Sequence, residues 1–395
     1  MSGRDREQKL HILIALLYYL PHHTGLTLHV QRVAEELVRR GHTVTVLSAR
    51  FRPELAREER INGVRVVRLW PLPLHISRGM LLPAYPWAAA RLIRDHDLVW
   101  VQTPLLETAL LAWLARRARR PLVVTHHGDL VLGAGLFNRL ISATMFRLYT
   151  YLARRARRLF AYSEDYATHS HYLRPFADKV SVIHPPILIP QPERQQAQEL
   201  RAEWAAEGGP IIGFCGRFVA EKRPDLLLRS LEIIREHYPT VRLIFAGEYD
   251  IRYENFWRRC RSLRERFAEH LRFLGSIDDP QQLANFYAAC DVLALTSDTE
   301  CFALVQVEAM LCGTPVVMTD TPGGRVPVRV TGMGRLAKVG DWRSIGENLL
   351  AVLEEPERYQ RPRAEIQQMF SFAETVDRYE EHFYRALGRR VGPLA

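Results

Sequence analysis

The sequence predicts an α/β protein of two domains, each built around a parallel sheet. Short apolar segments of strand length alternate with amphipathic segments of helix length through both halves of the chain. The apolar segments are continuous, which is typical of parallel strands that helices cover on both faces. The pattern restarts after the proline-rich residues 186–193, and 395 residues suffice for two domains of about 200 residues each.

In the first half, the apolar segments predict strands and the amphipathic segments predict the helices between them. The helix predicted at 27–40 carries its apolar residues on one face and ends at Gly41, a residue common just after helices. The strands predicted here are 10–19, 43–48, 64–69, 98–102, 122–125, 159–161 and 180–183. The run of residues 10–20 also resembles the apolar part of a signal peptide. Because no small-x-small cleavage site follows it, we interpret it as a buried first strand.

The second half repeats this alternation. Its predicted strands are 211–215, 241–246, 271–274, 292–295 and 315–318. The intervening prolines predict a linker, followed by a connecting helix at 195–207. We therefore predict an N-terminal Rossmann-like domain at 1–188, a linker and connecting helix at 189–207, a second domain at 208–370, and a C-terminal segment at 371–395 with a helix at 372–387. Ligands of such sheets bind outside the carboxyl ends of the strands, so candidate site residues are expected there.

Composition and charge narrow the class of protein and its partners. The net charge of +10 is concentrated in residues 1–190, which hold 27 basic and 14 acidic residues. This favours an anionic partner such as a membrane surface, a phospholipid or a phosphorylated acceptor. No zinc-finger, RNP or KH motif is present, so no nucleic-acid partner is expected. Five cysteines without a C-x-x-C pair favour a reducing cytoplasm, and no apolar run reaches the ~18 residues of a membrane span.

A cationic motif follows the first strand of the second half. Gly216 ends that strand, and Arg217 and Lys222 follow where a helix is expected to begin. A glycine lets the backbone approach a ligand, and two cations at the positive end of a helix dipole suit a diphosphate. Only four of the 54 basic residues are lysines, so a lysine here is consistent with a need for a compact charge. The alternative is that both are solvated surface charges.

Two glutamates eight residues apart form the second motif. Glu300 lies in the loop after strand 292–295, and Glu308 lies among apolar residues of the next predicted helix. A carboxylate in such a helix is costly unless it is paired with ligand hydroxyls or a cation. Backbone amides at the start of this helix are suited to phosphate or sugar oxygens. The alternative is that Glu308 is an exposed charge on an amphipathic helix.

Together these motifs resemble a known family. Residues 211–341 resemble the nucleotide-sugar domain of glycosyltransferase family 4, the group 1 retaining enzymes of the GT-B fold. The matching pieces are Gly216-Arg217…Glu221-Lys222, Glu300…Glu308, Gly313-Thr314-Pro315, Thr321-Pro322-Gly323-Gly324 and Gly334-Arg335…Gly340-Asp341. Cys301 departs from the usual Gly or Ser, and Pro327 stands where relatives often carry an acidic residue. The resemblance implies two Rossmann-like domains facing each other across a cleft, with the C-terminal helix crossing back to the first domain.

The resemblance also implies roles for individual residues. The cations of the first motif would hold the donor diphosphate, Glu308 the ribose hydroxyls and Glu300 the hydroxyls of the donor sugar. Backbone groups would contact the sugar and phosphate, and the residues implied are Gly216, Phe302, Ala303 and Leu304.

In the first half the resemblance is looser. Gly25 lies between the first strand and first helix, where relatives carry a Gly-Gly loop, and would let backbone amides approach the donor phosphate or the acceptor. His127, which directly precedes Gly128, is carried over as the active-site histidine that would hydrogen-bond the donor sugar near its reacting carbon. His126 is the second choice, and the alternative is a histidine that caps a strand end. His29 also resembles a family position, but a helix histidine is more often structural.

The resemblance implies a retaining glycosyltransferase. It would move a hexose-type sugar from a nucleotide-diphosphate sugar to a hydroxyl acceptor that is lipid-linked, a phospholipid or a saccharide, with catalytic residues Arg217, Lys222, Glu300 and His127. Two alternatives stay open: a nucleotide-sugar 2-epimerase of similar fold, and a non-catalytic nucleotide-sugar-binding subunit. The sequence assigns no acceptor residue.

No cofactor and no tightly bound metal are expected. Asp95-His96-Asp97 matches an Asp-x-Asp metal motif only superficially, because it precedes strand 98–102 at the wrong end of a parallel sheet, and we interpret it as solvated surface. The expected location is cytoplasmic. The basic amphipathic segment 139–158 leaves two interpretations: a helix packed on the sheet with a solvated basic end, or a helix on the anionic inner face of the cell membrane.

Overall fold

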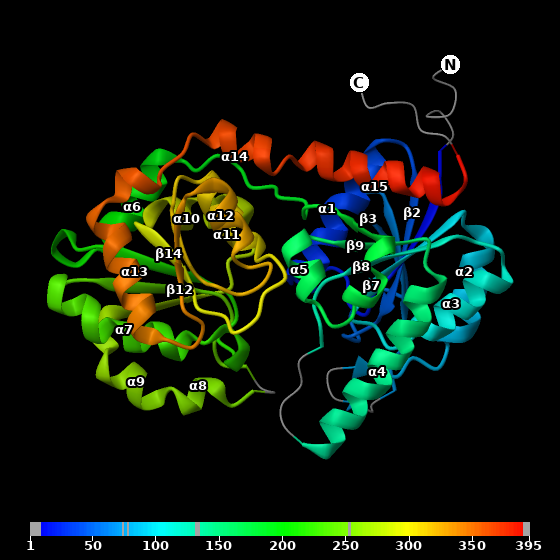
Figure 1. The fold of residues 1–395 in the computed structure, drawn as a ribbon, viewed down its shortest axis with the longest axis horizontal. Helices are drawn as coiled ribbons and strands as arrows, with labels where there is room; N and C mark the ends of the chain where they lie inside the picture. The colour runs from blue at the N-terminus through cyan, green and yellow to red at the C-terminus, as the bar shows by residue number, and fades with distance from the viewer. Residues whose placement is uncertain (1–8, 73–74, 77–78, 131–134, 252–253, 390–395) are drawn as a thin grey trace. The chain divides into compact units, whose positions relative to one another are not determined.

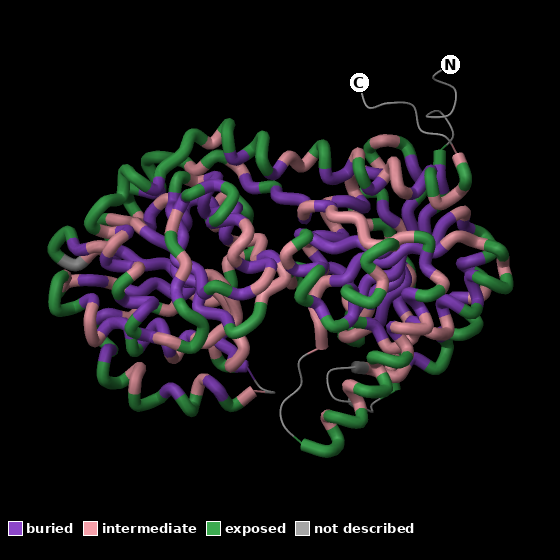
Figure 2. Tube along the Cα trace, in the orientation of Figure 1, coloured by how far each residue is buried: buried purple, intermediate pink, exposed green. Residues whose placement is uncertain are grey.

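The computed structural model describes residues 9–72, 75–76, 79–130, 135–251 and 254–389 of the chain. The chain forms two units. Unit 1 comprises the residues up to Pro186 together with those from Ala373 onward, and unit 2 comprises Ile187–Phe372. Figure 1 gives the elements of both units, and Figure 2 shows that buried residues follow the strands inside each of them.

Unit 1 contains an eight-stranded sheet in the order β10-β9-β8-β7-β1-β2-β4-β3. Its strands are β1 (His11–Ala15), β2 (Thr43–Ala49), β3 (Glu58–Ile61), β4 (Val64–Leu69), β7 (Leu98–Thr103), β8 (Leu122–His126), β9 (Arg158–Ala161) and β10 (Val180–Val182), and a separate hairpin pairs β5 (His75–Ile76) with β6 (Gly79–Met80). All neighbouring strands of the large sheet are parallel except β3 and β4. The strand order reverses between β1 and β7, which is where α/β sheets bind ligands.

Unit 2 contains a six-stranded sheet of entirely parallel strands in the order β13-β12-β11-β14-β15-β16. The strands are β11 (Ile211–Cys215), β12 (Arg242–Ala246), β13 (Leu271–Gly275), β14 (Val292–Leu295), β15 (Val316–Thr319) and β16 (Gly334–Ala337). The order reverses between β11 and β14. Aromatic rings fill one face of this sheet, where Phe245 stacks on Phe273 with ring centroids 4.8 Å apart.

Helices connect the strands in both units. They are α1 (Gly25–Arg39), α2 (Tyr85–Asp95), α3 (Thr108–Arg117), α4 (Leu136–Arg155), α5 (Glu164–His169) and α15 (Phe372–Ala386) in unit 1, and α6 (Arg194–Trp204), α7 (Pro224–His237), α8 (Phe256–Arg259), α9 (Arg261–Arg266), α10 (Pro280–Ala289), α11 (Leu304–Leu311), α12 (Val326–Thr331), α13 (Trp342–Glu354) and α14 (Arg363–Met369) in unit 2. The class predicted from the sequence, two parallel-sheet α/β domains, is confirmed.

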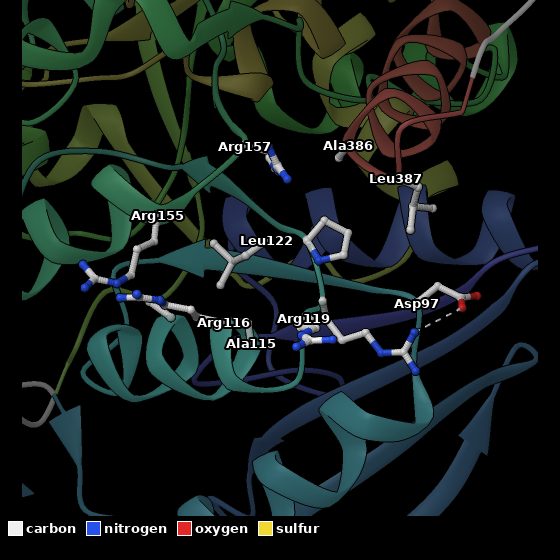
Figure 3. A pocket seen from close by; sticks show the side chains of 12 residues that line it. Asp97, Ala115, Arg116, Arg119, Leu122, Arg155, Arg157, Ala386 and Leu387 are labelled. Atoms are coloured by element: carbon white, nitrogen blue, oxygen red, sulfur yellow. Dashed lines mark ion pairs between the residues drawn. The ribbon is translucent and has the colours of Figure 1, made fainter.

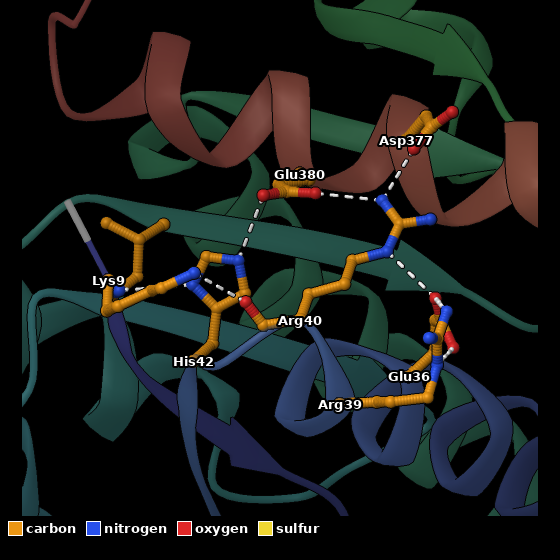
Figure 4. A network of polar contacts seen from close by, with 8 residues as sticks. Lys9, Glu36, Arg39, Arg40, His42, Asp377 and Glu380 are labelled. Carbon is orange, nitrogen blue, oxygen red and sulfur yellow. Dashed lines mark hydrogen bonds and ion pairs between the residues drawn. The ribbon is translucent and has the colours of Figure 1, made fainter. Parts of the chain in front are cut away.

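The last helix, α15, returns to unit 1 and is anchored there by apolar and ionic contacts. Its Tyr379 and Phe383 pack against the buried indole of Trp100 in β7, with ring centroids 4.9 and 5.1 Å away. Arg40, at the end of α1, reaches Asp377 at 2.5 Å and Glu380 at 2.9 Å (Figure 4). Burial of the rings and pairing of the charges act on the same helix face, so α15 is an integral part of this unit.

Four local predictions need correction. The antiparallel edge strand β3 was missed because Glu58-Glu59-Arg60-Ile61 is too charged to resemble a buried strand. β16 was missed because Gly334-Arg335-Leu336-Ala337 is short and carries a single large apolar residue. The connecting helix ends at Trp204 and packs on α10 within unit 2, where Arg201 pairs with Asp291 at 2.9 Å.

The basic helix predicted at 139–158 is the fourth correction. It runs instead from Leu136 to Arg155, and Arg158 already belongs to β9. No helix within the described ranges combines the length and the apolar character that crossing a bilayer requires.

Candidate active site

In unit 2, the cationic motif and the first glutamate meet where the strand order reverses. Lys222 ends a short 3₁₀ turn after β11, and Glu300 follows β14, its neighbour in the sheet. The Lys222 ammonium forms an ion pair with Oε1 of Glu300, and the Ser297 hydroxyl donates to the same oxygen over 2.9 Å. Burial disfavours the ammonium, but the adjacent Glu300 outweighs it and raises the pKa of Lys222 above its ordinary value. Lys222 therefore stays protonated at neutral pH.

The turn that carries Lys222 is tied to the end of β14. The Thr296 hydroxyl lies 2.9 Å from the carbonyl oxygens of both Lys222 and Arg223. The backbone N–H of Asp298 donates to the Glu221 carbonyl at 2.9 Å. These contacts hold the two loops together, so the ion pair sits on a fixed framework. α7 begins only at Pro224, two residues after the lysine.

Gly216 and Arg217 follow β11 directly. Gly216 has a φ of +155°, a conformation that side-chain-bearing residues rarely adopt, and its N–H donates to the Ala246 carbonyl at 2.9 Å. A Cβ at this position would meet only the Phe214 ring, at 3.7 Å, so the requirement for glycine is conformational. Arg217 is partly buried at the same edge of the sheet.

Glu308 is buried, with 2% of its surface exposed, which overturns the alternative that it is a solvated surface charge. It lies in α11, and the hydroxyl of Tyr287 from α10 is 3.3 Å from its Oε2. The same hydroxyl is 3.3 Å from Sγ of Cys215 at the end of β11. A buried carboxylate at the carboxyl edge of a sheet is positioned to accept hydrogen bonds from a ligand.

The segment before α11 has an unusual backbone. Ala303, the residue before the helix, has a φ of +59°, which is uncommon for a residue with a side chain. The buried amide of Gln306 donates to the carbonyls of Phe302 at 3.0 Å and Gly324 at 2.7 Å. α11 begins at Leu304, so of the three residues Phe302, Ala303 and Leu304 only the last lies in the first turn of the helix.

In unit 1, His127 follows β8 and both of its ring nitrogens are engaged. Nε2 lies 2.8 Å from Oε1 of Gln102 in β7, and Nδ1 lies 2.5 Å from the Tyr162 hydroxyl. That hydroxyl is also 3.1 Å from Nδ1 of His29 in α1. With Gln102 accepting, His127 carries its proton on Nε2, Tyr162 donates to His127, and His29 donates to Tyr162.

We call the four hydrogen-bonded residues the His127 chain: Gln102, His127, Tyr162 and His29. Their surroundings favour uncharged imidazole rings. Burial, with the neighbouring His29 and His126, holds the pKa of His127 well below its ordinary value. Burial, with a contribution from Arg32, lowers the pKa of His29 to about 3. Neither ring therefore titrates near neutral pH, and His127 offers a fixed tautomer rather than a proton-transfer group.

His126, the second choice from the sequence, has a different environment. It is 1% exposed, its Nε2 lies 2.8 Å from Oδ1 of Asp129, and its Nδ1 lies 2.8 Å from the Thr103 hydroxyl. Burial opposes ionisation of Asp129, but its bonds to His126 and Ser170 lower its pKa below the ordinary value. His126 thus fixes the loop after β8.

Two further sequence-predicted positions differ from expectation. Gly25 is the first residue of α1 rather than part of a loop, and it follows the helix-capping residue Thr24. His96 of the Asp-x-Asp segment is 4% exposed and bonds to Thr45, so this segment is only partly solvated. Among the residues described, no three His, Cys, Asp or Glu side chains gather as they would around a metal ion. Independence from metal stays a prediction.

Several site partners were not identified from the sequence. Ser297, Tyr287, Gln102 and Tyr162 each contact a predicted residue. Gln102 and Tyr162 carry a detectable signal, because each is a polar residue at the carboxyl end of an apolar strand segment. Tyr287 carries none, since it lies within a helix whose pattern is amphipathic.

Comparisons with known proteins agree with this arrangement. Residues 24–186 match the glycosyl transferase 4-like domain, and residues 196–369 match the glycosyl transferases group 1. The phosphatidyl-myo-inositol mannosyltransferase of Mycobacterium leprae is 26% identical over 363 residues, which cover 88% of this chain and 90% of the relative. The GDP-mannose-dependent alpha-mannosyltransferase of Mycobacterium tuberculosis is 26% identical over 385 residues, covering 95% and 97%.

Solved structures share the fold. Anabaena HepE in complex with UDP and glucose superimposes with a TM-score of 0.76 at 20% identity, covering 95% of this chain and 100% of that chain. Sucrose-phosphate synthase from Thermosynechococcus elongatus gives 0.78 at 19% identity, covering 96% and 100%.

The two parallel sheets thus define a protein of the GT-B fold. The chain belongs to the group 1 glycosyltransferases, family 4, as its motifs predicted, and it transfers a glycosyl group from a nucleotide sugar to an acceptor.

Proposed function

We propose that the protein moves a hexose from a nucleoside diphosphate sugar to a hydroxyl of an inositol- or lipid-bearing acceptor, with retention of configuration. The observation that carries this proposal is the Lys222–Glu300 ion pair at the strand-order reversal of unit 2. The names of two relatives favour GDP-mannose as the first donor to test and a phosphatidylinositol as the first acceptor.

Each charged group has a role that fits glycosyl transfer. Negative charge develops on the leaving diphosphate, and Lys222 and Arg217 supply the positive charge that stabilises it. Glu300 accepts hydrogen bonds from the donor sugar, which requires it to share Lys222 with the incoming phosphate. Glu308, buried beside Tyr287, accepts from the ribose hydroxyls. Gly216 and the Phe302–Leu304 backbone contribute contacts to phosphate and sugar.

His127 contributes a hydrogen bond to the donor sugar in this proposal. Because both of its ring nitrogens already have partners, the sugar must replace Gln102 at Nε2 while Tyr162 remains at Nδ1. No carboxylate stands out as a nucleophile. The proposal therefore assigns deprotonation of the acceptor hydroxyl to the departing diphosphate on the same face of the sugar, with no metal required.

The test is a donor panel with product analysis. GDP-mannose, GDP-glucose, UDP-glucose and UDP-galactose are each incubated with phosphatidylinositol, with and without EDTA. A new glycolipid with the anomeric configuration of the donor, formed equally with EDTA, supports the proposal. An altered donor sugar formed without acceptor supports an epimerase instead, and donor binding without any product supports a non-catalytic subunit.

A matched pair of variants separates the donor site from general effects. Glu308→Gln removes one buried charge and is expected to weaken GDP binding roughly tenfold, as loss of a charge-assisted hydrogen bond commonly does. Glu347→Gln changes an exposed glutamate of α13 and should leave GDP binding unchanged. Equal affinities in both variants would remove Glu308 from the site.

The membrane surface is part of the same proposal. α4 has no acidic residue, and its first turns expose Leu136 (84%), Phe137 (67%) and Leu140 (64%) beside Arg139. An exposed apolar end flanked by cations suits an anionic lipid surface. Replacing the three apolar residues by serine should lower cosedimentation with phosphatidylglycerol vesicles, whereas Trp113→Ser, an exposed apolar residue of α3, should not.

A further inference from the structure

A second cationic region lies at the amino-terminal ends of strands in the unit 1 sheet, whereas His127 lies at the carboxyl end. A pocket of about 500 Å³ opens beside Pro121 and Leu122, where β8 begins, whereas His127 directly follows the end of the same strand. Five residues of β8 separate the two positions by about 16 Å, because a strand rises about 3.3 Å per residue. The pocket is therefore distinct from the His127 chain.

Five arginines line this pocket, and they come from two helix ends and the loops that follow them (Figure 3). Arg116 lies in the last turn of α3, Arg119 and Arg120 follow that helix, Arg155 ends α4, and Arg157 precedes β9. The floor is apolar, with Ala112, Ala115 and Leu122 from this unit's core and Leu387, which follows α15.

The positive charge of the pocket is not balanced by acidic side chains. Asp97 is the single carboxylate in the lining, and it lies 3.9 Å from Arg120. Within the described residues no carboxylate lies within ion-pair distance of Arg116, Arg119 or Arg157. Nε of Arg155 is buried without a hydrogen-bond partner in that same part of the chain, and its guanidinium stacks on the Tyr151 ring.

Arginines at helix C-termini also have an ordinary explanation, because cations there stabilise the helix dipole. The end of α1 provides the comparison within the same unit. There Arg39 pairs with Glu36, and Arg40 pairs with Glu36, Asp377 and Glu380 (Figure 4). The arginines at the end of α1 thus have acidic partners, whereas among the described residues only Arg120 of the five around the pocket has one.

The backbone at Arg119 gives a second indication. α3 ends in a Schellman motif, in which the N–H groups of Arg119 and Arg120 donate to the carbonyls of Arg116 and Ala115 at 3.1 and 2.9 Å. The residue at the position of Arg119 is usually glycine, because its φ is positive, here +54°. An arginine there brings its cation to the pocket despite an unfavourable backbone conformation.

We propose that this pocket binds a phosphate ester, with the arginines holding the phosphate and the apolar floor holding the body of the molecule. The planar guanidinium group of arginine can form two hydrogen bonds to phosphate oxygens at once. Several guanidinium groups without acidic partners in one pocket favour a multiply charged anion. The same chemistry is offered by a small soluble phosphate and by the headgroup of a phosphatidic-acid-type lipid. The inference does not depend on the identity of the donor or acceptor.

The experiment compares two triple variants of equal charge in unit 1. The pocket variant is Arg116→Gln, Arg119→Gln, Arg157→Gln, and the control is Arg57→Gln, Arg60→Gln, Arg91→Gln, all exposed residues outside the pocket. Pyrophosphate is titrated calorimetrically into each protein at saturating GDP, which occupies a nucleotide site in unit 2. The pocket variant should bind pyrophosphate at least tenfold more weakly than the control.

A lipid arm distinguishes the two sources of phosphate. Cosedimentation with phosphatidylcholine vesicles containing phosphatidic acid is measured for both variants, which share the α4 apolar end and the net charge. Loss confined to the pocket variant, with little pyrophosphate affinity in the wild type, identifies a lipid headgroup. Pyrophosphate binding that only the pocket variant loses identifies a soluble ligand. Equal behaviour of both variants in both arms overturns the proposal.

Wild-type protein provides a check that does not depend on how the variants fold. Pyrophosphate at saturating GDP should slow amide hydrogen exchange in residues 115–122 and 155–158 more than in residues 57–69. Unchanged exchange at the pocket together with calorimetric binding would place the anion elsewhere and contradict the assignment.

Discussion

The hydroxyl of Tyr162 lies 2.5 Å from Nδ1 of His127 and 3.1 Å from Nδ1 of His29, so one phenol links two buried imidazoles. The hydroxyl has a single proton. If it donates to His127, it must accept from His29, and the tautomers of both rings are then determined. The structure thus connects a candidate active-site residue to a helix residue that the sequence suggested to be structural.

Removal of this phenol should affect turnover more than donor affinity. Tyr162→Phe leaves Nδ1 of His127 without its donor, so the ring loses its fixed tautomer and orientation. We expect kcat to fall about tenfold with the KM for the donor nearly unchanged. Steady-state kinetics, together with imidazole nitrogen chemical shifts that report the tautomer, measure both effects.

Tyr172→Phe is the matched control for this change. Its hydroxyl donates to the Tyr149 carbonyl at 3.1 Å, away from His127, and the residue is equally buried. Like Tyr162→Phe, it should lower the free energy of unfolding by about 1–3 kcal/mol, but it should leave kcat at the wild-type value. If both variants lose activity alike, the link between Tyr162 and His127 has no functional role.

Burial of His29 predicts a stability that decreases in acid. Its pKa is about 3 in the folded protein and about 6.5 when unfolded. The unfolded chain therefore binds the proton first as pH falls below about 6.5, which lowers the free energy of unfolding. Between pH 7 and 5 this one residue removes about 2 kcal/mol, and the loss continues until pH approaches the folded value.

Chemical denaturation at several pH values tests this dependence. His29→Asn keeps a donor for Tyr162 but does not titrate. In this variant the free energy of unfolding should depend less on pH, with a slope smaller by about one proton, roughly 1.4 kcal/mol per pH unit. Replacement of the exposed His237 by Asn serves as the control. An unchanged slope in the His29 variant would mean that other groups dominate acid unfolding.

Loss of the Lys222 charge should reduce catalysis strongly. Lys222→Ala is expected to lower kcat/KM by roughly 100-fold or more, because a fixed cation that stabilises the leaving diphosphate is lost. Lys338→Ala, an exposed lysine of the same unit, should retain full activity. Turnover near that of the wild type in the Lys222 variant would remove this lysine from the catalytic machinery.

The ion pairs that anchor α15 should contribute measurably to the stability of unit 1. Glu380 contacts Arg40 at 2.9 Å and His42 at 3.0 Å, and its side chain is 20% exposed. Glu380→Ala should lower the free energy of unfolding by about 1–3 kcal/mol, since the buried His42 loses its carboxylate partner and Arg40 keeps only Glu36 and Asp377. Glu265→Ala removes an exposed pair with Arg261 and should cost less than about 1 kcal/mol in the same denaturation experiment. Similar losses in the two variants would contradict the anchoring role.

Much of the fold could be predicted because the strands of both sheets are encoded locally. A run such as Ile211–Cys215 is apolar throughout and is followed by a glycine, so periodicity and turn chemistry agree. β3 could not be predicted in this way. Its residues Glu58–Ile61 form a strand only because the edge of the sheet at β4 offers backbone partners, and that information lies outside the segment.

Site residues could be predicted where the spacing within a sequence motif indicates where a charged side chain lies in the fold. Lys222, Glu300 and Glu308 were identified from spacing, and the structure brings Lys222 and Glu300 into contact across 78 residues. The partners of His127 were not predictable. Gln102, Tyr162 and His29 belong to three separate elements, and they meet only because the sheet order places β7, β8 and β9 side by side.

The return of α15 to unit 1 has a consequence for synthesis on the ribosome. Ile187–Phe372 is a continuous stretch, so its sheet is complete as soon as those residues have emerged. The earlier sheet must wait for Tyr379 and Phe383 to cover Trp100, although its own strands were translated first. The domain that begins first is therefore the one that matures last, and until then Trp100 lacks the cover of these two rings.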